Sequence, residues 1–414
     1  MRVLHIPQAY WPVVGGAEAY CQAISERLAE RGHEVTVFTS CASNVASLYS
    51  AASPPLAAGD ERVNGVVVRR FPIDYRWTSW ARALAGRVQP FWPLPGQALA
   101  AFGAGPHLPG IVKAIARHRA EVVMAMPFLS FVMYYPWAAR RWRGSRSAIA
   151  LIPCLHTLDT GLANSALPIA AMQAADAVLP FTTYEKQYLI ARGVPEGKIH
   201  TIGAGVHRLD SVKTDPRAFR KSHGLVEDPV VVFLGRVEEP KGVWFLMEAM
   251  LEVWKLLPTA RLVIAGTRTR QTDAMRARAS ALPRTARERT LWLLDFPESQ
   301  KPDLLAAADV VALPSVHESF GIAFLESWLF GKPVVGCRIG AVSGVIEDGE
   351  DGFLVTPGDR EELAHAILRL LVSPSLRLRL GDRGRRKTIE HCTWDAVASR
   401  IETVYEKIAR GRRH

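Results

Sequence analysis

Cysteine is scarce in this sequence, and its five residues lie far apart at Cys21, Cys41, Cys154, Cys337 and Cys392. No two of them have the close spacing of a zinc knuckle or a redox pair, which excludes a disulfide framework as the basis of the fold. We therefore expect reduced thiols in a cytoplasmic protein. The first residues enter a strand-like run directly and lack the apolar core and cleavage site of a signal peptide, in line with that location.

Long hydrophobic runs are also lacking. The one uncharged stretch that resembles a membrane span, residues 122–139, is interrupted by Pro127 and Pro136 and contains the polar Ser130. A spanning helix needs about 20 largely apolar residues in a row. We therefore expect a buried strand followed by a packed helix in this stretch.

The formal net charge is +11, because 51 Lys and Arg residues outnumber 40 Asp and Glu residues. A basic surface can attract nucleic acid, anionic lipid or an anionic substrate. The sequence has no zinc finger, no RNA-recognition signature and no single basic helix, so we expect no nucleic acid partner. Anionic lipid and anionic substrate remain as the alternatives.

Strand-like and helix-like segments alternate in two series, and 414 residues suit two domains of roughly 200 residues each. Such alternation predicts two parallel-sheet α/β domains. We expect an N-terminal Rossmann-like domain over residues 1–207, a second one over residues 208–390, and a C-terminal helix over residues 391–414 that packs back on the first domain. Sheets of this kind bind ligands at the carboxyl ends of their strands, often in a cleft between domains.

Two parts of the first series are less regular. Residues 63–70 predict one strand. Residues 41–61 are rich in Ala, Ser and Pro, and residues 71–109 are rich in Trp, Pro, Gly and Arg. Both of these compositions indicate long loops, which are usually functional or mobile in a compact fold.

The strongest chemical signal is the segment PSVHESFGIAFLE at residues 314–326. Glu318 lies in the loop after an expected strand, and Glu326 lies on the helix that follows. Gly321 allows close backbone approach, and the amides around it favour phosphate or a polar sugar at the start of that helix. One carboxylate can then contact sugar hydroxyls while the other contacts a ribose.

Two further signals also follow strands. The segment GRVEEPKG at residues 235–242 supplies Arg236 and Lys241, whose planar fork and compact charge suit a diphosphate. Gly15 and Gly16, between the first strand and the first helix, allow a ligand to approach the backbone at a helix N-terminus.

These motifs resemble those of family-four glycosyltransferases of the GT-B fold, in which two Rossmann-like domains face each other across a cleft. The resemblance covers nearly the whole chain and includes residues 28–37, 175–180, 193–199, 307–310 and 352–355. It implies a retaining hexosyltransferase that uses a nucleotide diphosphate sugar and needs no metal ion or other cofactor.

The resemblance also implies roles for single residues. Arg236 and Lys241 match a diphosphate-binding pair, Glu326 a glutamate that contacts the ribose, and Glu318 one beside the transferred sugar. His156 matches a histidine near the reacting centre and completes the implied catalytic set with Glu318, Arg236 and Lys241. The implied donor-binding residues are Gly15, Gly16, Arg236, Lys241, Glu318, Phe320, Gly321, Ile322, Ala323 and Glu326.

Retention of configuration needs either two displacements or an attack on the front face of the sugar. We find no carboxylate nucleophile paired with an acid, as glycosidases have. The resemblance implies front-face attack, in which the leaving phosphate helps to deprotonate the acceptor. There is no convincing Asp-x-Asp metal motif. The acidic residues 348–352 read as a turn, with a metal site as the alternative.

The expected donor is a UDP- or GDP-sugar, and the expected acceptor is a carbohydrate or a lipid-linked precursor of a cell-envelope polysaccharide. Residues 75–82, with Arg87, Phe91 and Trp92, mix aromatic and cationic side chains. This mixture fits either contact with the cytoplasmic face of a membrane or a loop packed on its own domain. The alternative functions are a non-catalytic sugar-nucleotide-binding partner and a GT-B epimerase of the nucleotide sugar.

Overall fold

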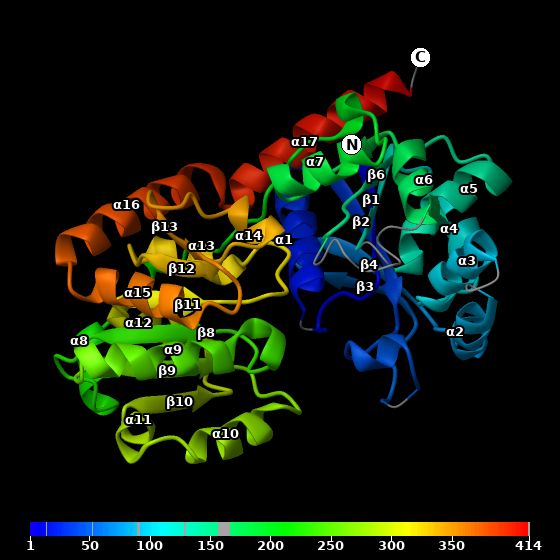
Figure 1. Ribbon diagram of the computed structural model, residues 1–414. Helices are drawn as coiled ribbons and strands as arrows, with labels where there is room; N and C mark the ends of the chain where they lie inside the picture. Colours follow the sequence, from blue (N-terminus) through cyan, green and yellow to red (C-terminus); the bar gives the residue numbers. More distant parts are fainter. Residues whose placement is uncertain (14, 52, 89–91, 128–129, 156–165, 413–414) are drawn as a thin grey trace. The chain divides into compact units, whose positions relative to one another are not determined.

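The computed structural model describes residues 1–13, 15–51, 53–88, 92–127, 130–155 and 166–412. The chain forms two compact units, Met1–Ala204 with Trp394–His414, and Gly205–Thr393. Each unit has a largely parallel sheet covered by helices (Figure 1), so the predicted α/β class is confirmed. The structure divides the chain at residues 204/205, beside the predicted boundary at 207/208.

The first unit contains a seven-stranded sheet in the order β3-β4-β2-β1-β5-β6-β7, parallel except where β3 meets β4. Its central strands are almost entirely buried, as expected of parallel strands that helices cover on both faces. The strands are β1 (Arg2–Pro7), β2 (Glu34–Ser40), β3 (Gly59–Val63), β4 (Val66–Phe71), β5 (Val122–Met126), β6 (Ala148–Leu151) and β7 (Ala177–Val178).

Eight helices surround this sheet in the described part of the first unit. The last of them, α17, returns after the second unit and packs against α1. The helices are α1 (Gly16–Glu30), α2 (Arg76–Val88), α3 (Pro93–Gly103), α4 (Ile111–His118), α5 (Tyr135–Arg143), α6 (Ala166–Ala174), α7 (Thr183–Ala191) and α17 (Trp394–Gly411).

The second unit has a six-stranded sheet in the order β10-β9-β8-β11-β12-β13, parallel throughout. Its strands are β8 (Val230–Leu234), β9 (Arg261–Gly266), β10 (Thr290–Leu294), β11 (Val310–Leu313), β12 (Val334–Cys337) and β13 (Gly352–Val355). Its helices are α8 (Pro216–Ser222), α9 (Val243–Leu256), α10 (Thr272–Ser280), α11 (Arg284–Glu288), α12 (Lys301–Ala307), α13 (Ile322–Leu329), α14 (Gly340–Ser343), α15 (Arg360–Leu371) and α16 (Pro374–His391).

Two local predictions are wrong. The strand predicted over residues 63–70 is instead a hairpin, because β3 and β4 pair antiparallel across Asn64 and Gly65. The loop predicted over residues 71–109 contains α2 and α3, which pack against each other. Residues 122–139 contain the predicted buried strand, β5, and most of α5. No helix among the described residues is long and apolar enough to cross a membrane.

Candidate active site

The two strongest sequence signals lie next to each other in the second unit because their strands are neighbours. Strand β8 pairs with β11, so that Val231 lies opposite Val310 and Val232 opposite Val311. The carboxyl ends of parallel neighbours meet at one edge of a sheet. The loop that carries Arg236 and Lys241 therefore meets the loop that carries Glu318.

A glycine allows these two loops to lie in close contact. Gly242 has a left-handed backbone with φ of +77°, and a Cβ at this position would collide with the carbonyl oxygen of Pro314. The amide of Val316 donates to the carbonyl of Pro240 at 3.0 Å across the same contact. A residue with a side chain at position 242 would separate the loops, so this glycine serves the site geometry.

Lys241 and Glu318, both predicted to bind the donor, form an ion pair. The Lys241 Nζ lies 2.8 Å from the Glu318 Oε2, and the two side chains are only 19% and 18% exposed. The Lys241 Nζ also lies 3.4 Å from the carbonyl oxygen of His317. Because both side chains are largely buried, neither can rotate freely, and the two charges are held in defined positions.

Arg236 follows β8 directly but lies largely in solvent. Its side chain is 63% exposed, and its guanidinium contacts the Glu238 Oε1 at 2.9 Å. A guanidinium has five N–H donors, so this one contact leaves most of them available to an anion. The site therefore has one fixed cation, at Lys241, and one accessible cation, at Arg236.

Glu326 is held by a lysine that the sequence analysis missed. The Lys301 Nζ, at the start of α12, lies 3.1 Å from the Glu326 Oε1 and 2.6 Å from the Glu298 Oε2. Burial raises the pKa of Glu326, and the nearby Lys301 ammonium offsets part of that rise. No motif marks Lys301, because the tertiary fold rather than the local sequence brings the start of α12 to Glu326 on α13.

The backbone at the start of α13 has free donors. Gly321 caps the helix with φ of +87°, and a Cβ there would collide with the ring of Phe324. In the described part of the chain, no oxygen accepts from the amides of Ile322 or Ala323. Orphan amides at a helix N-terminus attract anions and polar hydroxyls. Phe320 is buried beside them.

The remaining predicted residues belong to the first unit. Gly15 and Gly16 begin α1 at the carboxyl end of the loop after β1. His156 lies outside the described residues. The residue before it, Leu155, donates its amide to the Glu185 Oε1 at 2.8 Å.

Glu185 is a buried acid that the sequence analysis also missed. Besides the Leu155 amide, its carboxylate accepts from the amides of Phe181 and Thr182, and with Thr182 it closes the capping box of α7. Burial raises the pKa of Glu185 to about 7, although the three backbone donors oppose the rise. The Thr-x-x-Glu spacing at residues 182–185 is the sequence signal that could have found this cap.

The acidic turn at residues 348–352 uses its carboxylates in contacts within the protein. Asp348 pairs with Arg338 at 2.8 Å and accepts from the amide of Leu354. Asp351 is buried, pairs with Lys387 and accepts from the amide of Glu347. Among the residues that the structure describes, no group of three or more His, Cys, Asp and Glu side chains could hold a metal ion.

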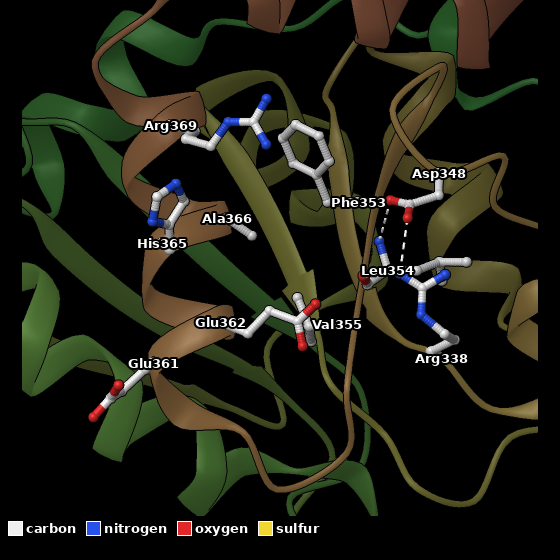
Figure 2. Close-up of a pocket in the computed structure, with 10 residues that line it drawn as sticks. All are labelled: Arg338, Asp348, Phe353, Leu354, Val355, Glu361, Glu362, His365, Ala366 and Arg369. Carbon is white, nitrogen blue, oxygen red and sulfur yellow. Dashed lines mark hydrogen bonds and ion pairs between the residues drawn. The ribbon is translucent and has the colours of Figure 1, made fainter.

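Figure 2 shows a pocket of about 410 Å³ elsewhere in the second unit, between β13, α15 and the loop residues Arg338 and Asp348. Arg338 and its partner Asp348 line one side, and His365 and Arg369 line the helix side, where the Arg369 guanidinium lies 4.6 Å from the Phe353 ring centroid. None of the predicted donor-binding residues lines this pocket. The charged lining of mixed sign shows no single ligand preference.

Comparison with known families and sequences gives a consistent match. Residues 215–387 match the family "Glycosyl transferases group 1", and residues 14–208 match "Glycosyltransferase Family 4". D-inositol 3-phosphate glycosyltransferase 2 of Catenulispora acidiphila is 30% identical over 95% of this chain and 90% of its own length. Alpha-D-kanosaminyltransferase of Streptomyces kanamyceticus is 26% identical over 58% of this chain and 62% of its own length.

Solved structures match the fold over almost the entire chain. The Anabaena protein HepE, solved in complex with UDP, aligns with a TM-score of 0.73 at 19% identity and covers 98% of this chain and 100% of its own. Sucrose-phosphate synthase from Thermosynechococcus elongatus aligns with a TM-score of 0.71 at 20% identity, over 99% of this chain and 100% of its own. These likenesses confirm the GT-B fold class.

Proposed function

Since this chain belongs to the group 1, family-four glycosyltransferases, we propose that it transfers a hexosyl unit from a nucleotide diphosphate sugar with retention of configuration and without a metal ion. The acceptor is a carbohydrate or a lipid-linked precursor of a cell-envelope polysaccharide. The observation that carries this proposal is the arrangement at one sheet edge of Lys241, Glu318 and the free amides at the start of α13.

Each group in this arrangement has a role in donor binding. The Lys241 ammonium and the Arg236 fork bind the diphosphate, because charge-assisted contacts to phosphate are short and strong. The amides of Ile322 and Ala323 add neutral donors at a helix N-terminus. Glu326, held by Lys301, accepts from the ribose hydroxyls, and Glu318 accepts from hydroxyls of the transferred sugar. Gly15 and Gly16, at the start of α1, are also proposed to contact the donor.

The proposed reaction is a front-face displacement. A bond forms between the acceptor oxygen and the anomeric carbon while the bond from that carbon to the diphosphate oxygen breaks on the same face. The electron pair leaves with the diphosphate, whose oxygen takes the proton of the acceptor hydroxyl. Arg236 and Lys241 balance the charge that develops there, as a divalent cation does in metal-dependent transferases. His156 is proposed to lie near the reacting centre.

The proposed donor is a UDP- or GDP-sugar, and the complex of HepE with UDP supports uridine. The proposed location is the cytoplasm, with peripheral contact between a membrane and residues 75–82, with Arg87, Phe91 and Trp92. Trp77 and Trp80 on α2 support this contact, because both indoles are about half exposed and their ring centroids lie 6.1 Å apart. A loop packed on its own domain would bury them.

A panel of UDP- and GDP-sugars in a thermal-shift assay, followed by product analysis, tests the proposal. The matching donor raises the melting temperature of the wild type and of the surface control Glu227→Ala, and it fails to do so for Glu326→Ala. Transfer to an added sugar acceptor supports the transferase. A new nucleotide sugar formed without acceptor identifies an epimerase, and binding without any turnover identifies a non-catalytic partner.

A further inference from the structure

Helices α4 and α5, which lie side by side in the first unit (Figure 1), share an unusual outer surface. Their inner faces enter the core through Ile111, Ile115 and Ala139. Their outer faces and the turn after α5 expose cations and two indoles. We call these residues the α4–α5 surface: Lys113, Arg117, Arg119, Trp137, Arg141, Trp142, Arg143 and Arg146.

The six charged residues of this surface are all cations, although Glu121 lines the same hollow as Arg119 and Arg146. Residues 111–119 and 135–146 contain no Asp or Glu. Arg140 is partly buried and pairs with Asp176, so it is not part of the surface. In the described part of the chain, none of the six exposed cations forms an ion pair with a carboxylate. Repulsion among unpaired cations disfavours the isolated protein and is relieved by an anionic partner.

The two indoles indicate which kind of anionic partner fits. Trp137 is 42% exposed and Trp142 is 67% exposed, and their rings meet edge to face at 6.1 Å. They therefore form one contiguous aromatic patch among the arginines rather than scattered exposed side chains. Tryptophan prefers the boundary between lipid headgroups and acyl chains, where its apolar ring and its N–H are both satisfied. Arginine beside it contacts lipid phosphate.

We propose that the α4–α5 surface docks on an anionic lipid bilayer. A nucleic acid would satisfy the cations, but a duplex backbone offers no apolar layer for two neighbouring indoles. The docking goes beyond the proposed transfer reaction, because it requires neither donor nor acceptor. It adds a second surface to the proposed contact through α2, because its indole pair belongs to a different helix.

Vesicle co-sedimentation of the full chain tests this proposal, with phosphatidylcholine alone and with phosphatidylcholine mixed with phosphatidylglycerol. The variant Arg141→Gln/Arg143→Gln/Arg146→Gln removes three surface charges. The control variant Arg276→Gln/Arg284→Gln/Arg287→Gln removes the same charge from exposed positions of the second unit. Trp137→Ala/Trp142→Ala removes the indoles and leaves the charge unchanged. Circular dichroism and the melting temperature confirm that each variant folds.

The proposal predicts salt-sensitive binding to the mixed vesicles and little binding to phosphatidylcholine. Each arginine at such a surface contributes on the order of fivefold in affinity, so the triple variant on α5 loses on the order of a hundredfold. The indole variant weakens binding at every salt concentration, and the control binds as the wild type does.

Three results would overturn the proposal. Equal losses of vesicle binding in the α5 variant and in the control would show that binding depends on net charge and not on this surface. Loss of binding only in Trp77→Ala/Trp80→Ala would assign the contact to α2 alone. Tighter binding to duplex DNA than to mixed vesicles, lost in the α5 variant, would make the partner a nucleic acid. Each readout is independent of transfer, so a failed transferase assay leaves this test intact.

Discussion

Two lysines beside the proposed donor site form ion pairs that join separate segments. Lys241 joins the loop after β8 to Glu318 in the loop after β11, and Lys301 joins α12 to Glu326 on α13. A buried charge is costly unless it is paired, so each ion pair offsets part of that cost and holds a carboxylate at a fixed position. The residues expected to touch the donor are therefore held in place before any donor binds.

Loss of either diphosphate cation should remove most of the activity while the protein stays folded. One charge-assisted contact to the leaving group contributes on the order of 3 kcal/mol, or about a hundredfold in rate. We expect this loss for Arg236→Ala and Lys241→Ala, measured as kcat/KM. Arg236→Lys should rescue only in part, because the planar fork is lost.

The matched controls are Arg284→Ala and Lys255→Ala, which remove exposed cations of the same unit. They should retain the wild-type rate. Wild-type kinetics in Arg236→Ala and Lys241→Ala would show that these cations do not stabilise the leaving diphosphate.

Glu185 should make the stability of the protein depend on pH. Burial raises its pKa to about 7 from an ordinary value of 4.5, so the folded state prefers the protonated carboxyl. Folding then takes up a proton between these values, and the free energy of unfolding falls as the pH rises through this window. Across this window, the contribution of Glu185 to the free energy of unfolding falls by on the order of 3 kcal/mol.

Urea unfolding between pH 4.5 and 8 measures this dependence. Glu185→Gln carries no titrating group and should show a flatter profile, although it loses part of the cap of α7. An unchanged slope in the variant would mean that other groups cause the pH dependence.

At the scale of the element, the strand–loop–helix from β11 to α13 was predictable, because its motif combines a buried strand, a glycine and a helix that carries glutamate. The partner loop after β8 was predictable for the same reason. The pairing of Lys241 with Glu318 was not, because it depends on β8 and β11 being neighbours in the sheet. Sequence distance gives no indication of strand order.

Two elements were mispredicted for identifiable reasons. The Asn64-Gly65 pair is a strong hairpin signal. The apolar run around it predicted a single strand, but the chain turns at this pair and forms a hairpin. The Gly and Pro content of residues 71–109 predicted a loop. The segment instead forms α2 and α3, because tertiary packing stabilises both helices despite this composition. Local composition is a weak guide where two helices stabilise each other.

Gly321→Ala should disturb the start of α13 by two effects. The left-handed backbone costs a residue with a Cβ about 1 to 2 kcal/mol, and the Cβ also collides with Phe324. Gly358→Ala is the matched control, because its φ of +85° is similar and nothing lies within 4 Å. We expect both variants to lose stability in urea, with a larger loss at Gly321.

Only Gly321→Ala should also weaken nucleotide binding, because the amides of Ile322 and Ala323 move with the helix start. Calorimetric titration with nucleoside diphosphate measures this effect. Equal affinity in the two variants would argue against a donor role for these amides.

For the whole molecule, the chain crosses between the two units at residues 204/205 and again at 393/394. The second crossing leads into α17, which is fastened to the first unit by an ion pair between Arg31 and Glu402 at 2.9 Å and by a contact between Tyr405 and His5 at 3.2 Å. The two crossings lie beside each other, because the amide of Val206 donates to the carbonyl oxygen of Cys392 at 2.9 Å. The alternation of strand-like and helix-like segments predicted both units, whereas these two contacts of α17 join residues far apart in sequence and could not be predicted from it.

The two units should close when the donor binds, because Gly15 and Gly16 belong to one unit and Arg236 and Lys241 to the other. A ligand that contacts both units favours the closed state by its extra affinity for that state. Small-angle scattering should show a smaller radius of gyration with saturating nucleoside diphosphate. The Arg236→Ala/Lys241→Ala variant should show no change, and an unchanged profile for the wild type would contradict closure.

We propose that this transferase retains configuration and uses two protein cations, Arg236 and Lys241, in place of a metal ion. Proton NMR of the reaction in excess EDTA, with the donor that gives the largest thermal shift, tests it most directly. We expect transfer to proceed at the rate seen without chelator, and the anomeric coupling of the product to match that of the donor sugar. A product of inverted configuration, or transfer that stops in EDTA and resumes with manganese or magnesium, would contradict it.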